Sequence, residues 1–366
     1  MHSFSRRQFL QSSVAVAAAA GLPLAVQAQE RNFNPQPGAW RTFEVTTRVE
    51  VLVPSGATKV WLPVPSIDTE WQQSLESSFA SNGEARLTGD GQEGARLLYA
   101  EFPASQGQPW VELTSRVRTQ NRSASQRDLS DVLTAQDRKY WTRATKLLPT
   151  DGIVRTTAVA ATRGARTDEE KARAVYDWVV ANTYREPKVR GCGEGDIKGM
   201  LESGNMGGKC ADINAVFVGL LRSVGVPARD VYGLRLAPSA FGYKELSGNP
   251  ASLKGAQHCR AEVFLNGRGW VAMDPADVAK VMRLETPEWI KTTRHAVVSP
   301  VNRALFGGWE GNWVAWNTAH DVQLPNTKAE RLNFFMYPIA EDAQGRRDPY
   351  SPDDFKYTIS ARELTT

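Results

Sequence analysis

Several residue types and patterns are scarce in this chain of 366 residues, and each scarcity argues against a class of protein. Three cysteines are too few for a disulfide scaffold. The four histidines lack metal-ligand spacing and no loop has calcium-ligand spacing, so we expect no metal and no cofactor. Beyond the first 28 residues no apolar run is long enough to span a membrane. The net charge of +4, without a block of Lys and Arg, does not indicate a nucleic-acid partner.

Residues 1–28 have the features of a secretory signal peptide. The motif Ser-Arg-Arg-Gln-Phe-Leu at 5–10 is typical of twin-arginine export, and an apolar stretch follows it to Val26. The alternative is an uncleaved membrane anchor, but Gly21 and Pro23 keep this stretch only moderately hydrophobic. We therefore expect a bacterial, periplasmic or secreted protein with no membrane span after the signal is removed.

Residues 29–125 have the pattern of a β-domain. Short apolar and β-branched runs, separated by turns rich in Gly and Pro, predict strands at 43–51, 59–65, 96–102 and 110–117. Strands of this length and spacing are typical of an antiparallel β-sandwich, which is the fold that we expect for this domain.

Residues 126–290 combine helical signals with a hairpin, so the expected fold class of the whole chain is α+β. The expected elements are a helix after Thr167, a helix from Cys210, a strand at 228–234 and a hairpin formed by 259–265 and 270–273. The last segment, 291–366, is expected to be a C-terminal extension packed on this core.

Three residues of the second domain could together carry out nucleophilic chemistry. Cys210 is expected at a helix N-terminus, which lowers the pKa of a thiol and offers backbone N–H groups to an oxyanion. His258 on the first hairpin strand could be the base, and Asp274 on the second could orient its ring. Asp277 is an alternative to Asp274. Alternation along the first strand places Cys259 on the face opposite to His258.

Two long motifs surround these residues: Gly-Lys-Cys-Ala-Asp-Ile-Asn-Ala-Val-Phe-Val-Gly-Leu-Leu-Arg-Ser-Val-Gly-Val-Pro-Ala-Arg (208–229) and His-Cys-Arg-Ala-Glu-Val-Phe-Leu-Asn-Gly-Arg-Gly-Trp-Val-Ala-Met-Asp-Pro (258–275). They resemble the nucleophile helix and the His/Asp hairpin of the transglutaminase-like superfamily. The resemblance covers roughly residues 140–290. It implies a papain-like core with a triad of Cys210, His258 and Asp274. Arg260 departs from this family, whose members often have an aromatic residue there.

Other segments carry weaker signals. Asn205 could donate a hydrogen bond to an oxyanion, although a role in a turn is more ordinary. The glycine-rich segment 190–196 is either a lid over the site or a surface loop. Cys192 and Cys259 are either small buried residues or a disulfide pair. An aromatic binding surface or simple core packing would explain Trp309, Trp313 and Trp316.

These observations lead to two interpretations from different classes. The first is an exported cysteine enzyme that forms a Cys210 thioester from an amide and resolves it with water, as a peptidase or amidase, or with an amine, as a protein-glutamine acyltransferase. Its partner would be a peptide or protein, with cell-wall peptide suggested by the compartment. The second is a non-catalytic binding or scaffold protein, against which the intact Cys/His/Asp set argues. A metal site at Cys210 and His258 is disfavoured because further ligands are missing.

Overall fold

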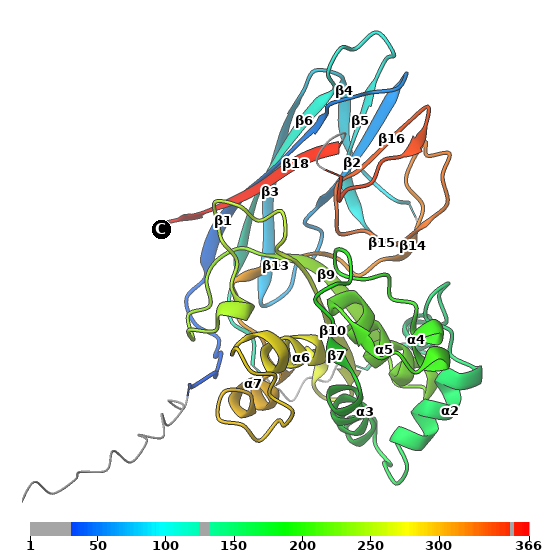
Figure 1. Cartoon of the computed structure of the whole chain (residues 1–366), viewed down its shortest axis with the longest axis vertical. Helices are drawn as coiled ribbons and strands as arrows, with labels where there is room; N and C mark the ends of the chain where they lie inside the picture. The colour runs from blue at the N-terminus through cyan, green and yellow to red at the C-terminus, as the bar shows by residue number, and fades with distance from the viewer. Residues whose placement is uncertain (1–30, 92, 124–131, 352–354, 366) are drawn as a thin grey trace, which may run out of the picture.

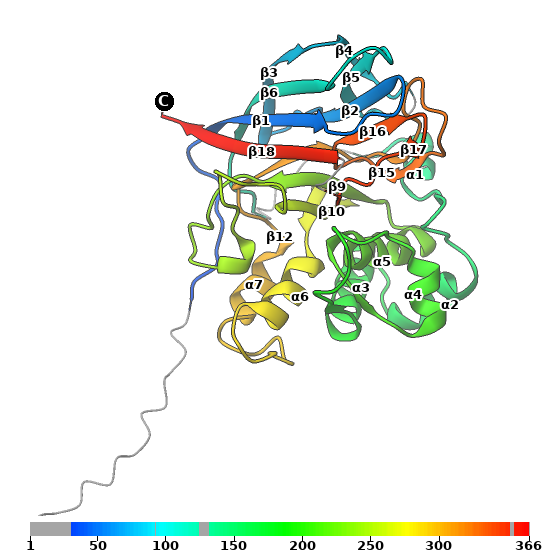
Figure 2. The same cartoon turned by 45° about the horizontal axis from the view of Figure 1, so that its top comes forward.

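The computed structural model describes residues 31–365 except 92, 124–131 and 352–354. The expected signal peptide lies outside the described residues. Two β-sheets form one half of the molecule, and a third sheet lies below them with helices on its far side (Figures 1 and 2). Among the described residues, no helix has the length and apolar character needed to cross a bilayer.

The first half is built from two antiparallel sheets. One has the order β18-β1-β6-β3, with β1 (Arg41–Val51), β3 (Gln72–Ser81), β6 (Trp110–Thr119) and β18 (Phe355–Leu364). The other has the order β17-β16-β2-β5-β4, with β2 (Thr58–Val64), β4 (Glu84–Gly89), β5 (Arg96–Phe102), β16 (Ile339–Asp342) and β17 (Gly345–Arg346). The four strands expected from the sequence are therefore present.

Strand β1 shows why these residues form a sheet with one buried face. Its buried and partly exposed residues alternate along most of its length, as period-two side-chain geometry requires. Val45 and Val49 from β1 join the same hydrophobic cluster as Leu62 from β2. Strands β3 and β4 were not expected, because they are mostly polar and exposed. They lie at sheet edges, where β3 pairs with β6 and β4 pairs with β5, and this pairing holds them although their sequences lack a strand pattern.

The C-terminal segment returns to the first half of the molecule. Strand β18 pairs with β1 from Thr42↔Leu364 to Val51↔Phe355, and β16 pairs with β2. Figure 1 shows the red C-terminal strand beside the blue N-terminal one. The segment 291–366 thus supplies strands to both halves, since β13 joins the third sheet.

The third sheet has the strand order β12-β11-β10-β9-β13. Its members are β9 (Ala228–Arg235), β10 (Gln257–Leu265), β11 (Gly269–Met273), β12 (Phe306–Gly307) and β13 (Trp313–Asn317). Short pairs are formed by β7 (Tyr184–Arg185) with β8 (Gly207–Gly208), which are parallel, and by β14 (His320–Val322) with β15 (Leu332–Phe334).

Helices flank this sheet. They are α1 (Ala135–Trp141), α2 (Gly152–Ala161), α3 (Asp168–Asn182), α4 (Ile197–Ser203), α5 (Cys210–Ser223), α6 (Pro275–Leu284) and α7 (Ser299–Ala304), with a short 3-10 turn η1 (Lys244–Leu246). The expected cap of α3 is confirmed: Thr167 and Glu170 form a reciprocal capping box. Helix α5 begins at Cys210 as expected, and all of its residues are buried.

The hairpin of β10 and β11 differs from its prediction at one end. Its register pairs Leu265 with Gly269 and Ala261 with Met273, so the turn lies where expected. Strand β11 ends at Met273, however, and Asp274 is the N-cap of α6 rather than a strand residue. The sequence Asp-Pro favours this change, because proline suits the first turn of a helix and Asp suits its cap.

Candidate active site

Cys210 is the first residue of the buried helix α5, and the chain before it is held tightly. The Asp212 carboxylate accepts hydrogen bonds from the Lys209 N–H at 2.9 Å and from the Gly195 N–H at 2.9 Å. A Cβ on Gly208 would lie 2.5 Å from the Asp212 Cβ, so only glycine allows this close approach. The helix N-terminus and its thiol are therefore fixed against the loop before α4.

His258 and Asp274 meet from two different elements. His258 lies on β10 opposite Gly233 of β9, and its Nε2 is 2.8 Å from the Asp274 Oδ2. The other oxygen of Asp274 accepts from the Asp277 N–H at 3.1 Å, which is its capping bond to α6. Because Nε2 is used by Asp274, Nδ1 is the ring nitrogen left for the thiol.

A second carboxylate also approaches the imidazole. The Asp277 Oδ2 lies 3.4 Å from the His258 Nε2, and the Arg235 Nη2 is 2.5 and 2.7 Å from the two Asp277 oxygens. The sequence analysis gave Asp277 as an alternative to Asp274 for the orienting carboxylate. In the structure both carboxylates lie beside the His258 ring. The paired arginine was not foreseen, because its partner is distant in sequence and no local pattern marks it.

These charges explain the pKa of His258. Burial disfavours the imidazolium, but the carboxylates of Asp277 and Asp274 outweigh it and raise the pKa to about 9. Burial raises the pKa of Asp277, but the positive charges of Arg235 and His258 outweigh burial and hold this pKa well below its ordinary value. The imidazole is thus charged at neutral pH.

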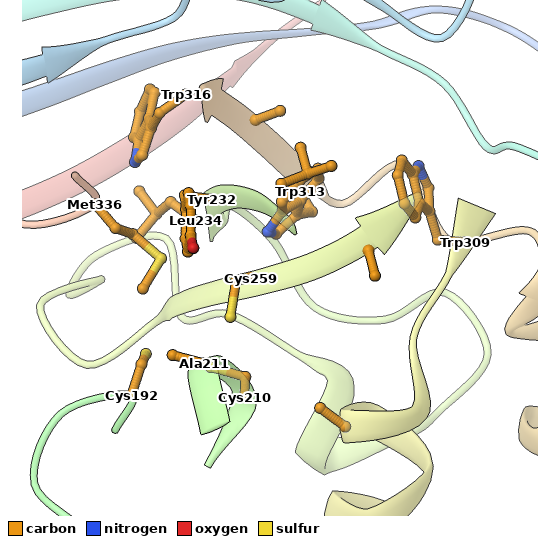
Figure 3. Packing of buried hydrophobic residues seen from close by; sticks show 14 of the residues in the cluster. Cys192, Cys210, Ala211, Tyr232, Leu234, Cys259, Trp309, Trp313, Trp316 and Met336 are labelled. Carbon is orange, nitrogen blue, oxygen red and sulfur yellow. The ribbon is translucent and has the colours of Figure 1, made fainter. Parts of the chain in front are cut away.

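The pKa of the Cys210 thiol moves the other way. Burial raises it, but hydrogen bonds from Cys192, Cys259 and His258, with the charge of His258, bring it well below its ordinary value. The site therefore favours a thiolate beside an imidazolium. Cys259 was expected on the face opposite to His258, and its contact with Cys210 was not foreseen. Figure 3 shows its thiol directed toward the start of α5.

The segment 190–196 lies against the nucleophile. The Ala211 N–H donates to the Cys192 carbonyl at 2.9 Å, and Arg190 forms an ion pair with Asp348 at 2.7 Å. Cys210 is 2% exposed. A cavity of about 460 Å³ is lined by Gly193, Gly207 and Asp212 among others. Cys192 and Gly195 of this segment are buried, whereas Arg190, Glu194 and Asp196 are exposed.

The weaker sequence signals are resolved by burial and contacts. Asn205 is exposed, and its Oδ1 accepts from the Gly207 N–H at 3.3 Å, which is a turn bond. Of the two interpretations of the tryptophans, core packing is the one that the structure supports, because all three are buried: Trp309, Trp313 and Trp316. The Trp313 Nε1 donates to the His258 carbonyl at 2.9 Å, so this ring supports the site from behind.

Arg260 is buried rather than part of a substrate groove. Its Nε lies 3.6 Å from the Asp274 Oδ2, and its guanidinium carbon lies 4.6 Å from the Trp313 ring centre. Burial lowers the pKa of Arg260 to about 10 against the pull of Asp274 and Asp277. The residue at the family's aromatic position therefore contacts the carboxylate that orients His258.

Comparison with known families and proteins gives a consistent result. The model of the transglutaminase-like superfamily matches residues 155–275, and that of the twin-arginine translocation signal matches residues 3–23. An uncharacterised protein of Haemophilus influenzae is 33% identical over 343 residues, covering 88% of this chain and 91% of that protein. The chain belongs to the transglutaminase-like superfamily. It also carries a twin-arginine signal sequence, which directs export.

Two solved structures resemble this transglutaminase-like chain at low identity. A Cytophaga hutchinsonii protein provisionally assigned as a cysteine protease is 17% identical, with a TM-score of 0.49, and covers 89% of this chain and 99% of that one. The periplasmic domain of TgpA from Pseudomonas aeruginosa is 15% identical, with a TM-score of 0.37, and covers 76% and 79%. Neither likeness bears on the reaction of this chain.

One side-chain group of this transglutaminase-like site has the donor set of a metal centre. Ligand atoms of His258, Asp274 and Asp277 all lie within 4.8 Å of one another. The cations Arg235 and Arg260 already face the same two carboxylates. A further cation would have to displace or withstand these charges, so the donors fit an ion-paired imidazole better than a metal.

Proposed function

We propose that this chain is an exported cysteine enzyme that acts on amide-linked acyl groups, with Cys210, His258 and Asp274 as its triad. The observation that supports this most directly is the His258 Nε2 to Asp274 Oδ2 distance of 2.8 Å, with Cys210 at the start of α5 and its pKa lowered. This arrangement supplies a nucleophile, a base and an orienting group.

In the proposed mechanism the Cys210 thiolate attacks the carbonyl carbon of an amide. The negative charge that develops on the carbonyl oxygen is placed near the Cys210 N–H at the helix start, since the Ala211 N–H is already used by Cys192. The His258 imidazolium protonates the departing amine, and the C–N bond breaks to leave a thioester. Water or a second amine, deprotonated by the now neutral His258, then attacks the thioester and releases the thiolate.

The triad fixes neither the acceptor nor the substrate of the proposed reaction. Water would make the enzyme a peptidase or amidase, and an amine would make it a protein-glutamine acyltransferase. The twin-arginine signal favours a periplasmic or secreted location, so we propose a peptide or protein substrate there, with cell-wall peptide first. We further interpret the two sheets of the first half as a β-sandwich domain (29–125) beside the catalytic domain (126–290), completed by 291–366.

The first test is alkylation of the folded, signal-free protein by iodoacetamide across pH, with the modified cysteine identified by mass spectrometry. We expect Cys210 to react selectively, with an apparent pKa well below that of a free thiol. The variant His258→Ala should raise that pKa. If Cys210 titrates like an ordinary thiol in both proteins, the proposal is wrong and a non-catalytic binding role is favoured.

The second test uses substrates. Cell-wall peptides and glutamine-containing peptides, the latter with and without a primary amine, are incubated with the wild type and with Cys210→Ala. We expect amide cleavage or amine incorporation that the variant loses by about a thousandfold or more. Product identity separates hydrolysis from transfer, and full activity in Cys210→Ala would contradict the proposal.

A further inference from the structure

All three cysteines of the chain lie at one place. Cys192, Cys210 and Cys259 are free thiols, all of them buried, and the thiol of Cys210 interacts with both of the others. Figure 3 shows Cys192 on the segment beside α5 and Cys259 on strand β10, on two sides of the nucleophile. The proposed mechanism uses one of these thiols, which leaves two to be explained.

The backbone of Cys192 lies beside the start of α5, and its thiol donates to the Gln257 carbonyl at 3.2 Å. The hydrogen bond of 2.9 Å from the Ala211 N–H to the Cys192 carbonyl holds the two backbones side by side. Disulfides require this kind of close and fixed approach. On either side of Cys192, Gly191 and Gly193 adopt φ values of 52° and 91°. Glycine adopts these left-handed φ values without a steric penalty, so the chain can turn sharply on both sides of Cys192.

Cys259 is a poorer partner for the same bond. It lies inside β10, opposite Tyr232 of β9, and its carbonyl accepts from the Asn214 Nδ2 at 2.9 Å. Its side chain is fully buried. Movement there would disturb the central sheet, whereas the loop that holds Cys192 lies outside regular secondary structure and borders a cavity of about 460 Å³ through Arg190, Gly193 and Glu194.

We propose that Cys192 is a resolving thiol for Cys210, so that a peroxide converts the pair reversibly into a disulfide. The Cys210 thiolate attacks one peroxide oxygen, the O–O bond breaks, and a sulfenic acid forms on Cys210 as hydroxide leaves. Cys192 sulfur then attacks the Cys210 sulfur, the S–O bond breaks, and water leaves with the proton of Cys192. Two thiols are oxidised to one disulfide, and one peroxide is reduced to two waters.

The electrostatics of the pair agree with this order of events. Cys210 has the lowered pKa and reacts first. The pKa of Cys192 is raised, first by its hydrogen bond to Cys210 and then by burial. A sulfenic acid on Cys210 is neutral, so the first of these causes is lost when Cys192 has to react. Loss of activity in the disulfide form rests on the proposed function, but formation of the disulfide does not.

The test uses the reduced, signal-free protein treated with hydrogen peroxide and then with iodoacetamide. Peptide mapping without reductant is expected to show a Cys192–Cys210 disulfide with Cys259 alkylated or free. Iodoacetamide labelling of Cys210 should be lost and should return after dithiothreitol. A Cys210–Cys259 disulfide, or sulfinic acid on Cys210 with Cys192 still a thiol, would overturn the proposal.

Two matched variants sharpen this result. In Cys192→Ser, peroxide should drive Cys210 to sulfinic acid, and dithiothreitol should no longer restore labelling. In Cys259→Ser, the disulfide and its reversal should persist. Equal recovery in Cys192→Ser and wild type would contradict the inference even if the wild-type map were ambiguous. Failure of Cys210 to react when reduced would instead count against the proposed function, so the two failures differ.

Discussion

The outer face of one sheet and the candidate site use charged residues in opposite ways. On the outer face of the sheet that contains β1, β6 and β18, Glu44 is paired with Arg362 at 2.8 Å and with Arg116 at 3.0 Å, and both arginines are exposed. At the site, Asp277 and Arg235 form an ion pair that is almost completely buried. The contact distances are similar, but the surroundings differ completely.

The difference lies in solvent. Exposed pairs gain little, because water and salt screen the attraction and two flexible side chains must be ordered. Buried pairs interact strongly, but each charge has lost its hydration, so removal of one partner leaves the other at high cost. The sheet can therefore lose a charge with little effect. At the site, a whole set of charges must be kept together, and the same set raises the pKa of His258.

The largest expected effect comes from removal of one buried charge. Arg235→Ala leaves the buried Asp277 carboxylate without its paired guanidinium, and we expect the free energy of unfolding to fall by about 3–5 kcal/mol. The matched control is Arg362→Ala, for which we expect a change within about 0.5 kcal/mol. Urea unfolding followed by circular dichroism measures both. Equal losses for the two variants would remove the distinction between the sheet surface and the site.

How far the sequence predicted each half follows from the same physics. Local patterns predicted the capped helix α3, the start of α5 at Cys210 and the position of the hairpin turn, since each depends on neighbours in the chain. Polar strands at sheet edges, such as β3, were missed because pairing with β6 rather than their own pattern holds them.

Side-chain contacts in the site were also predicted only where a local sequence pattern marks them. The triad could be proposed from motifs because its three residues lie in two long and specific segments. Arg235 and Cys192 were not foreseen as neighbours of Asp277 and Cys210, because contacts between distant segments leave no local signal. Asp274 was placed on a strand because the hairpin pattern was extended one residue past its end.

The second prediction concerns the pKa of His258. After the opposing effect of burial, the Asp277 charge is the largest influence that raises this pKa to about 9. Asp277→Asn removes a negative charge beside the imidazolium, so the pKa must fall. The measurement is an NMR titration of labelled histidine, with the His258 signal assigned from His258→Gln.

A control with the same substitution is available at a second buried pair, since the Asp230 Oδ2 lies 3.2 Å from the His320 Nε2. Asp230→Asn should shift the titration of His320 and leave that of His258 near 9. An unchanged His258 pKa in folded Asp277→Asn would show that Asp277 does not act on the imidazole.

The third prediction gives the pH dependence of stability. His258 has a folded pKa of about 9, above the ordinary 6.5, so folding favours its protonated form. Its contribution is complete below pH 6.5 and is lost as the pH rises through 9. It amounts to about 3 kcal/mol. Cys210 has the opposite sign, because its folded pKa is lowered, so the measurement is made in Cys210→Ala. Between pH 6.5 and 9, the unfolding free energy should fall more in the single variant Cys210→Ala than in the double variant that carries both Cys210→Ala and His258→Gln. Parallel curves would contradict the assignment.

The smallest expected effect tests the exposed side of the comparison. A double-mutant cycle of Glu44→Ala and Arg362→Ala should give a coupling free energy below about 1 kcal/mol in low salt, because both side chains remain partly hydrated. In 1 M sodium chloride the Debye length falls to about 3 Å, and the coupling should vanish. The loss caused by Arg235→Ala should change little in the same salt, since ions cannot reach a buried pair. A coupling of several kcal/mol that persists in salt would mean that the sheet surface is as strongly organised as the site. The contrast between the sheet surface and the site would then have to come from packing rather than from solvent.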